Sequence, residues 1–490
     1  MKSIFTLVLI NVSILLLAQD IPFPNHTIYE THIKPNNYTQ TELDSHTSDF
    51  YEQWKAVFLK NDCNASEYYI YTSNGAINVS EAQGYGMMIT AIMAGYDTSA
   101  QAFFNGLYNF YKSHSSSINE NLMDWQQVAC NDTPSNDDDA ASDGDIDIAY
   151  GLLLANIQWG SFGAINYLNE AQTIINAIMQ DEINQETWTV KLGDWPDNSN
   201  IDYYYGTRTS DFITDHFRSF ACFTDNNNWN KVVDSCYSII NKMQINYSPN
   251  TGLLPDFIIN VNTNPEPAPP DYLEDNTDGK YYYNACRDPW RLACDYLVNG
   301  EINAYNSVNK INYWLKNATS LNVGNISNGY SLNGTAMYSW NDATFLGPFT
   351  VGAMLDTNQN WINNLYEELL NGNNISNGSY YSNTLKLLSM IVISGNYWAP
   401  DCNISENQIL KTQNKIHIYQ DITNNIIHIN LTSNNENLKY SIIDINGKTK
   451  NEGIILNSFN SINIALYSSG MYFVSVIIGD DVITKKIIKL

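Results

Sequence analysis

Basic residues are scarce in this chain of 490 residues. It has 24 Lys and Arg against 51 Asp and Glu, which gives a formal net charge of -27 at pH 7. A surface of this kind repels phosphate backbones and anionic lipid, so it argues against a nucleic-acid-binding protein and against attachment to a membrane surface. Neutral or cationic ligands are the easier partners for such a chain.

Long apolar runs are also missing after the first residues. Beyond residue 19 no stretch approaches the roughly 18 apolar residues that a membrane helix needs, so no membrane span is expected. Residues 1–19 combine one Lys with a short apolar run, Ile4–Leu17, and end in Ala18–Gln19. This pattern is typical of a cleaved signal peptide, so we expect a secreted protein.

No two cysteines form a CxxC pair. The seven cysteines are scattered at positions 63, 130, 222, 236, 286, 294 and 402, a spacing that does not support a zinc site. Export permits disulfides, but an odd count leaves at least one thiol free and the spacing does not give the connectivity. No metal and no organic cofactor are predicted.

Apolar residues recur at helical spacing from about residue 47 to residue 394. Apolar helices such as Gly86–Ala94 alternate with amphipathic helices such as Phe103–Lys112. This alternation favours an all-α (α/α)6 barrel over residues 25–402, although a helical solenoid would show a similar periodicity. The expected helices begin near Asp49, Ser80, Thr98, Asp145, Ala164, Asp215, Asn228, Asp288, Glu301, Asp342, Asn360 and Asn383.

The composition changes after Cys402. Short β-branched runs separated by Asn, Gly and Ser predict a small antiparallel β-sandwich over residues 415–490, after a linker at 403–414. The strands carry few aromatic residues, which disfavours a carbohydrate-binding module. The expected strands are Ile416–Tyr419, Ile426–Leu431, Leu438–Ile443, Ile462–Leu466, Met471–Ile478 and Val482–Ile488.

Three segments of this β-domain resemble the C-terminal sorting domain of type IX secretion cargo. They are DINGK at Asp444–Lys448, the later SSGMYFVSV and the closing TKKIIKL. The resemblance implies that outer-membrane secretion machinery is a partner and that the protein reaches the cell surface or the medium.

Glu81 is the first candidate for chemistry. Glycosidic hydrolysis needs a carboxylic acid that protonates the leaving oxygen and a carboxylate that activates water. Ser80 and Gln83 predict an N-cap box that places Glu81 in the first turn of a helix, where a Glu often only complements the helix dipole. Gly84 and Gly86, each costing about 1 kcal/mol relative to Ala inside a helix, point instead to a close approach at this position.

Asp143 is the second candidate. Asp143, Asp145 and Asp147 imitate the start of an EF-hand, but Gly is missing at the sixth position and Leu154 stands where the closing Glu belongs. Calcium binding in that mode is therefore excluded. Asp145 and Asp147 are explained by capping and first-turn charge, whereas Asp143 precedes an otherwise buried helix and is harder to explain structurally.

Four stretches together resemble glycoside hydrolase family 8, in the same order and with comparable separations. They are SEAQGYGMM, LMDW ending at Trp125, ASDGDIDIAYGLLLA and YYYNACRDPWRLACDYL. The resemblance spans roughly residues 45–400 and implies an (α/α)6 barrel of inverting endo-glycanases that act on cellulose, mixed β-glucan, xylan or chitosan. It implies that Glu81 is the general acid, that Asp143 grips and distorts the sugar, and that Trp125 is a stacking platform.

One position departs from the larger branch of this family. Asn284 stands where that branch has its base Asp, and an amide cannot take a proton from water at neutral pH. A second branch, which includes chitosanases and β-glucanases, has Asn there and takes its base from a Glu in a loop near a Pro-rich stretch. Glu274 falls in the matching place, so the resemblance implies that Glu274 is the base. Asp288 is the alternative, although Asp288–Pro289 also fits an N-cap followed by a first-turn Pro.

Further side chains are expected around these carboxylates. Arg287 should hold a carboxylate in place, and burial beside Asp143 should raise the pKa of Glu81. Asp215 and His216 are interpreted as structural. The side chains expected to contact substrate, besides Trp125, are Tyr85, Asp211, Tyr283, Asn284 and Arg287.

The sequence therefore predicts a secreted, monomeric endo-β-1,4-glycanase. Glucan and chitosan are nearly equal as expected substrates, and xylan follows. A non-catalytic glycan-binding protein of the cell surface is the competing class, which Asn284 would favour if Glu274 were not the base. A polysaccharide lyase would need a basic cleft for uronates, and the acidic composition argues against it.

Overall fold

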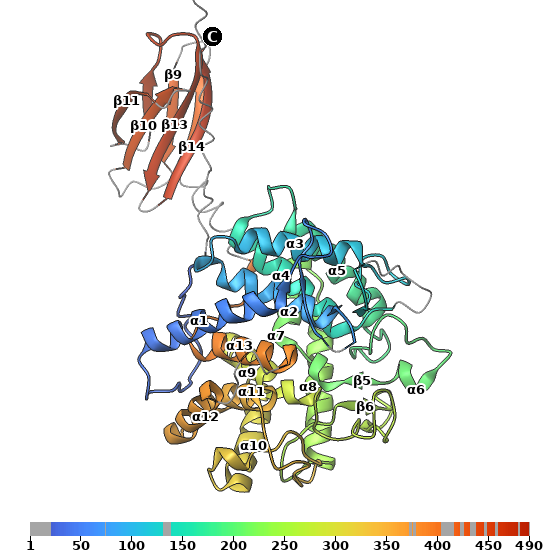
Figure 1. Ribbon diagram of the computed structural model, residues 1–490. Coiled ribbons are helices and arrows are strands. Elements are labelled where there is room, and N and C mark those ends of the chain that lie inside the picture. The colour runs from blue at the N-terminus through green and yellow to red at the C-terminus, as the bar shows by residue number, and fades with distance from the viewer. Residues whose placement is uncertain are drawn as a thin grey trace, which may run out of the picture. The chain divides into compact units, whose positions relative to one another are not determined.

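The computed structural model divides the chain into two compact units, Met1–Pro400 and Asp401–Leu490 (Figure 1). The signal peptide predicted at 1–19 and the linker predicted at 403–414 lie outside the described residues. The described residues are 21–73, 75–130, 139–371, 375, 379–402, 416–421, 426–431, 438–444, 448–455, 459–478 and 481–489.

The first unit alternates inner and outer helices, as predicted. The inner helices are buried on most sides: α2 (Ser80–Ile92), α4 (Ser142–Trp159), α7 (Thr214–Thr224), α9 (Asp288–Asn299), α11 (Ala343–Ala353) and α13 (Tyr380–Ile393). The outer helices bury one face: α1 (Gln40–Phe58), α3 (Ala100–Ser113), α5 (Tyr167–Ala177), α8 (Asn228–Asn246), α10 (Ile302–Thr319) and α12 (Gln359–Asn371). Each inner helix contacts the next and α13 returns to α2, so the ring is closed (Figure 1). The fold is an (α/α)6 barrel and not an open solenoid.

Short elements lie in the loops of the barrel. Helix α6 (Ile201–Tyr204) is a single turn. Three small antiparallel sheets pair β1 (Leu59–Lys60) with β2 (Tyr69–Ile70), β3 (Asn78–Val79) with β4 (Gln126–Gln127), and β6 (Phe257–Ile259) with both β5 (Thr207–Arg208) and β7 (Glu266–Pro267). None of the helices in the described part of the chain has the length and the apolar character needed to cross a membrane.

The first helix begins earlier than the apolar pattern indicates. It starts at Gln40 and not near Asp49, because Thr39 and Glu42 form a capping box. The Thr39 hydroxyl accepts the backbone N–H of Glu42 at 3.3 Å, and the Glu42 carboxylate accepts the backbone N–H of Thr39 at 2.7 Å. Polar caps of this kind precede the apolar residues, so periodicity alone does not find them.

Close packing explains the glycines of α2 and α4. A Cβ at Gly84 would lie 2.6 Å from the Cβ of Asp147, and one at Gly144 would lie 2.2 Å from the hydroxyl of Ser80. The close approach inferred at Gly84 is therefore made by α4. The predicted cap box of Ser80 and Gln83 is wrong, because the side chain of Gln83 donates instead to the carbonyl of Leu107 at 2.7 Å.

A layer of buried charges joins three inner helices. Asp147 of α4 accepts two bonds from Arg291 of α9, at 3.0 and 2.5 Å, and lies 3.1 Å from the Nε2 of His216 of α7. Burial lowers the pKa of His216, but Asp215 and Asp147 outweigh it, so that the pKa lies above its usual value. Asp215 and Asp147 are thus interior ion-pair partners and not helix caps.

Two buried carboxyl groups lie together beside this layer. Asp145 of α4 and Glu182 are fully buried, and burial raises the pKa of both well above its usual value. Asp145 also accepts the backbone N–H of Met123 at 2.9 Å, so its carboxyl group cannot turn away from Glu182. The folded protein therefore retains protons that the unfolded chain releases above about pH 4.3, the ordinary pKa of Glu.

Glu182→Gln should raise the melting temperature at pH 8 and change it little at pH 5. In the native protein, stability falls as the pH rises because the folded state binds more protons than the unfolded state, and Gln has no proton to lose. Thermal unfolding at both pH values measures the effect, with Glu120→Gln at an exposed position as the matched control. An equal shift at both pH values would contradict the linkage.

The second unit is the predicted β-sandwich. One sheet has the order β11 (Thr449–Ile455), β10 (Leu438–Asp444), β13 (Gly470–Ile478), β14 (Asp481–Lys489), and the other β12 (Phe459–Asn463), β9 (Ile426–Leu431), β8 (Ile416–Asp421). All pairings are antiparallel, and Ile429 and Val474 contribute to a core shared by both sheets. Strand β11 was not predicted, because its polar side chains are mostly exposed at a sheet edge.

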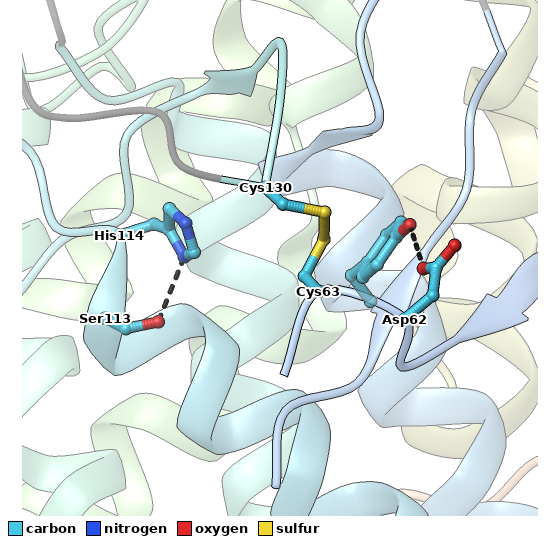
Figure 2. The surroundings of a disulfide bond; sticks show 6 residues. Asp62, Cys63, Ser113, His114 and Cys130 are labelled. Carbon is cyan, nitrogen blue, oxygen red and sulfur yellow. Dashed lines mark hydrogen bonds between the residues drawn. A yellow bond between two sulfur atoms is a disulfide. The ribbon is translucent and has the colours of Figure 1, made fainter. Parts of the chain in front are cut away.

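One disulfide involves a cysteine that is close in sequence to Trp125, a predicted substrate-binding residue. Cys63 and Cys130 are bonded across 67 residues, with Cα atoms 5.0 Å apart (Figure 2). Cys130 follows Trp125 closely in the chain, so the bond restrains the segment that presents this Trp. The buried Cys236, Cys286 and Cys294 are free thiols.

Candidate active site

The predicted acid and its neighbours meet at the N-terminal ends of inner helices. Glu81 lies in the first turn of α2, and Asp143 lies in the first turn of α4. Arg287 ends a 3-10 turn that leads into α9, and Tyr380 is the first residue of α13. Helix N-termini carry partial positive charge, which favours carboxylates at these positions.

Arg287 joins the two carboxylates. Its Nη1 atom donates to Glu81 at 2.6 Å and to Asp143 at 2.8 Å, and its Nη2 atom donates to the amide oxygen of Asn284 at 2.9 Å. The guanidinium is almost completely buried, so these contacts fix the separation of Glu81 and Asp143.

The environment gives the two carboxylates opposite pKa shifts. Burial, helped by Asp143, raises the pKa of Glu81 to about 7, although Arg287 and the hydrogen bond from Tyr380 act against it. Burial also raises the pKa of Asp143, but Arg287 and Arg208 outweigh burial and hold the pKa below its usual value. Up to about pH 7 the site therefore holds one carboxyl group that is largely protonated, Glu81, and one that is ionised, Asp143.

Glu274 reaches this cluster from the loop between β7 and α9. Its Oε2 atom accepts the amide N–H of Asn284 at 2.9 Å, and its Oε1 atom lies 3.5 Å from the Nη2 of Arg208. Arg208 also lies 3.7 Å from Asp143. Asn284 thus uses its oxygen for Arg287 and its amide N–H for Glu274. The side chain of Glu274 is 48% exposed, so water and ligands can reach it.

A pocket of about 300 Å³ opens beside Glu274. Its lining residues are Trp125, Asp139, Ala140, Ala141, Leu192, Trp195, Arg208, Leu273 and Glu274. Trp125 is 42% exposed, so part of its ring faces solvent, where a stacking platform would have to lie. Trp195 was not predicted, because a single Trp in a Gly-, Asp- and Pro-containing loop forms no periodic pattern.

Further aromatic side chains extend from Tyr283. The Tyr283 hydroxyl accepts the amide N–H of Asn328 at 3.2 Å, and its ring contacts that of Tyr282 at 4.6 Å. Tyr282 stacks on Tyr338 at 6.2 Å, and Tyr338 contacts Trp340 at 5.5 Å. Tyr338 and Trp340 are exposed and were not predicted, since their loop lacks helical or strand periodicity.

Two predicted substrate contacts are wrong in this structure. Tyr85 and Asp211 have no exposed surface, so neither lines the cleft. The Tyr85 hydroxyl accepts a bond from Arg287 at 3.3 Å, because Tyr85 lies one turn further into α2 than Glu81. Asp211 lies 3.5 Å from Arg208, and burial raises its pKa to about 7. Both side chains support the arginines from beneath.

Asp288, the alternative base, is also buried. It is the first residue of α9 and not the N-cap, and its carboxyl group accepts the Thr209 hydroxyl at 3.1 Å. Burial raises its pKa well above the usual value. A neutral, covered carboxyl group is a poor acceptor for a proton from water in the cleft.

Known proteins that are similar to this chain identify its family. The family model "Glycosyl hydrolases family 8" matches residues 30–395. The chain belongs to glycosyl hydrolase family 8. A second family model, "Secretion system C-terminal sorting domain", matches residues 421–490 of this family 8 enzyme. The type IX sorting domain confirms the predicted export, and the protein is secreted or displayed at the cell surface.

Named relatives cover almost the whole barrel. The family 8 chain is 45% identical to "Beta-glucanase" from Niallia circulans over 402 residues, which are 81% of this chain and 96% of the relative. It is 39% identical to "Endoglucanase" from Bacillus sp. (strain KSM-330) over 391 residues, 77% of this chain and 82% of the relative.

Solved structures confirm the fold. The apo structure of a β-1,3-1,4-glucanase from Paenibacillus sp. X4 has a TM-score of 0.74 and 45% identity, and the match covers 78% of this chain and all of that one. Rex8A from Paenibacillus barcinonensis, solved with xylose, has a TM-score of 0.60 at 16% identity, with 74% and 95% covered. The second likeness concerns the fold alone.

Proposed function

We propose that this protein is an endo-β-glucanase that hydrolyses a β-1,4-linked glucan by inversion, with Glu81 as general acid and Glu274 as general base. The observation that carries the proposal is the pair of contacts from Asn284 and Arg208 that bring Glu274 into the cluster of Glu81 and Asp143. The names of the relatives, a β-glucanase and an endoglucanase, support glucan as the substrate.

The reaction is a single displacement at the anomeric carbon. Glu81 gives its proton to the glycosidic oxygen as the bond between that oxygen and the anomeric carbon breaks. Glu274 takes a proton from a water molecule whose oxygen attacks the same carbon from the opposite face. The product carries an inverted, α-configured hemiacetal, and both carboxyl groups return to their starting states by exchange with solvent.

Asp143 and Trp125 bind the sugar in this scheme. Asp143 is ionised and held by Arg287, so it can accept hydroxyl bonds from the distorted ring and stabilise the positive charge that develops there. The exposed ring of Trp125 gives a neighbouring sugar an apolar face to stack on.

Chitosan is the second candidate substrate. The net charge of -27 would attract a cationic glucosamine polymer, and that attraction would weaken with added salt. Xylan is the third candidate substrate. The protein solved with xylose shares the fold, but it is only 16% identical to this chain.

Reducing-sugar release from barley β-glucan, carboxymethylcellulose, chitosan and xylan tests the proposal. We expect the fastest cleavage on a glucan, and the α-anomer should appear first in the proton NMR spectrum of fresh product. Initial formation of the β-anomer would exclude inversion. Binding of a polymer without cleavage would favour the non-catalytic glycan-binding alternative.

Tyr380→Phe should move the alkaline limb of kcat/KM to higher pH. The Tyr380 hydroxyl donates to Glu81 and thereby lowers the pKa of that carboxyl group. Without this bond Glu81 keeps its proton to a higher pH. The pH profile on a soluble glucan measures the shift. The matched control is Tyr381→Phe, because the Tyr381 hydroxyl donates to the carbonyl of Tyr283 at 2.6 Å; a limb that moves to lower pH in Tyr380→Phe contradicts the assignment.

A further inference from the structure

The loop that carries Glu274 folds around one buried carboxylate. The side chain of Asp278 is almost completely covered. Its Oδ2 atom accepts the backbone N–H groups of Leu273 at 2.7 Å and of Glu274 at 3.1 Å, and its Oδ1 atom accepts that of Asp275 at 3.0 Å. Three consecutive N–H groups therefore converge on a single side chain, as they do where a loop encloses an anion.

Asp278 is itself fixed to the barrel. Its carbonyl accepts the backbone N–H of Phe257 in β6 at 2.9 Å. Two residues later, the carbonyl of Lys280 accepts the backbone N–H of Asp256 at 2.7 Å. The backbone of Asp278 is thus attached to a strand, while its side chain holds the backbone of Glu274. Asp278 therefore connects the barrel directly to the loop that carries Glu274, the proposed base.

The side chain of Glu274 needs such a connection. It has a contact at 2.9 Å to Asn284 and a longer one, 3.5 Å, to Arg208, and about half of its surface is open to solvent. A side chain with so little packing around it takes its position from its backbone. General-base catalysis requires the carboxylate to lie within hydrogen-bonding reach of the attacking water.

We propose that Asp278 is a positioning residue for the base: by binding the three N–H groups of Leu273–Asp275 it keeps the Glu274 carboxylate against Asn284 and facing the cleft. This inference rests on the proposed role of Glu274. Asp278 touches neither the substrate nor the water and acts through the loop alone.

Asp278→Asn tests the inference because it preserves shape but replaces one accepting oxygen with an amide group that cannot accept. We expect kcat to fall by roughly 10- to 100-fold, as a misplacement of about 1 Å can cost a factor of that size, with a much smaller change in KM. Hydrogen exchange at the amides of Leu273, Glu274 and Asp275 should become faster. The matched control is Asp271→Asn, the same change at an exposed position of the loop, which should alter neither.

A double-mutant cycle separates positioning from a merely structural role. In Glu274→Ala assayed with azide, a small anion that attacks the anomeric carbon in place of water and needs no base, adding Asp278→Asn should cost less than about twofold. An equal loss in both backgrounds, or unchanged exchange at the three amides, overturns the inference. If Glu274→Ala alone is fully active without azide, the proposed base is wrong, and that result is visible before Asp278 is changed.

Discussion

Glu81→Gln should lower kcat on a β-glucan by roughly 100- to 10,000-fold, the range of general acid catalysis, with little change in KM. Gln keeps the size of Glu, and its amide oxygen can still accept one of the two bonds that Glu81 accepts on separate oxygens from Arg287 and Tyr380. It cannot supply a proton to the leaving oxygen. Steady-state kinetics on barley β-glucan measure the loss, with the exposed Glu120→Gln as the matched control.

The nature of the leaving group makes this prediction specific. A dinitrophenyl β-glycoside of cellobiose or a longer glucan leaves without protonation, so Glu81→Gln should lose far less activity on it than on the polymer. The wild-type kcat/KM should decline as the pH rises through about 7, because the Glu81 pKa lies there and only the protonated form is an acid. That alkaline limb should disappear in the variant. Equal losses on the two substrates would show that Glu81 is not the acid.

Glu274→Gln should cause a loss of similar size, roughly 100- to 10,000-fold, but on both kinds of substrate. The base acts on the attacking water, so a better leaving group does not replace it. In Glu274→Ala, azide should restore part of the activity and yield an α-configured glycosyl azide, which mass spectrometry and NMR identify.

Asp288→Asn is the matched control for the base. Asp288 is buried and burial raises its pKa, which favours the neutral carboxyl group, and an amide resembles that form. Near-normal activity is expected. An Asp288→Asn enzyme that loses as much activity as Glu274→Gln, while Glu274→Gln stays active, would return the role of base to Asp288.

The barrel could be predicted from the sequence because its signal is local. Buried and amphipathic helices alternate within a few tens of residues, and the long helices of the described chain other than α1 begin within three residues of the positions that the apolar period indicates. The capping details could not be found in the same way. The charge of Asp147, predicted as a first-turn effect, is balanced by Arg291, 144 residues further along the chain.

In the candidate site, too, local motifs could be recognised and contacts between distant residues could not. Glu81, Asp143 and Glu274 could be proposed from motifs and from their resemblance to a family. Arg287 was also expected to hold a carboxylate, but Tyr380 and Arg208 could not be found, because each lies far away in sequence: Tyr380 is 299 residues from Glu81, and Arg208 is 66 residues from Glu274. Tyr85 and Asp211 were assigned to the cleft because a motif gives proximity to a site but not the depth of a side chain within it.

The hydrogen bond between Tyr380 and Glu81 spans the seam at which α13 closes the ring onto α2. Glu81, the proposed acid, belongs to the first inner helix and Tyr380 to the last, so the two partners of this contact are made at opposite ends of domain synthesis. A nascent or truncated chain that stops before residue 380 has its acid but neither a closed ring nor this partner. We therefore expect cleavage of polysaccharide only from a chain whose barrel is complete through α13.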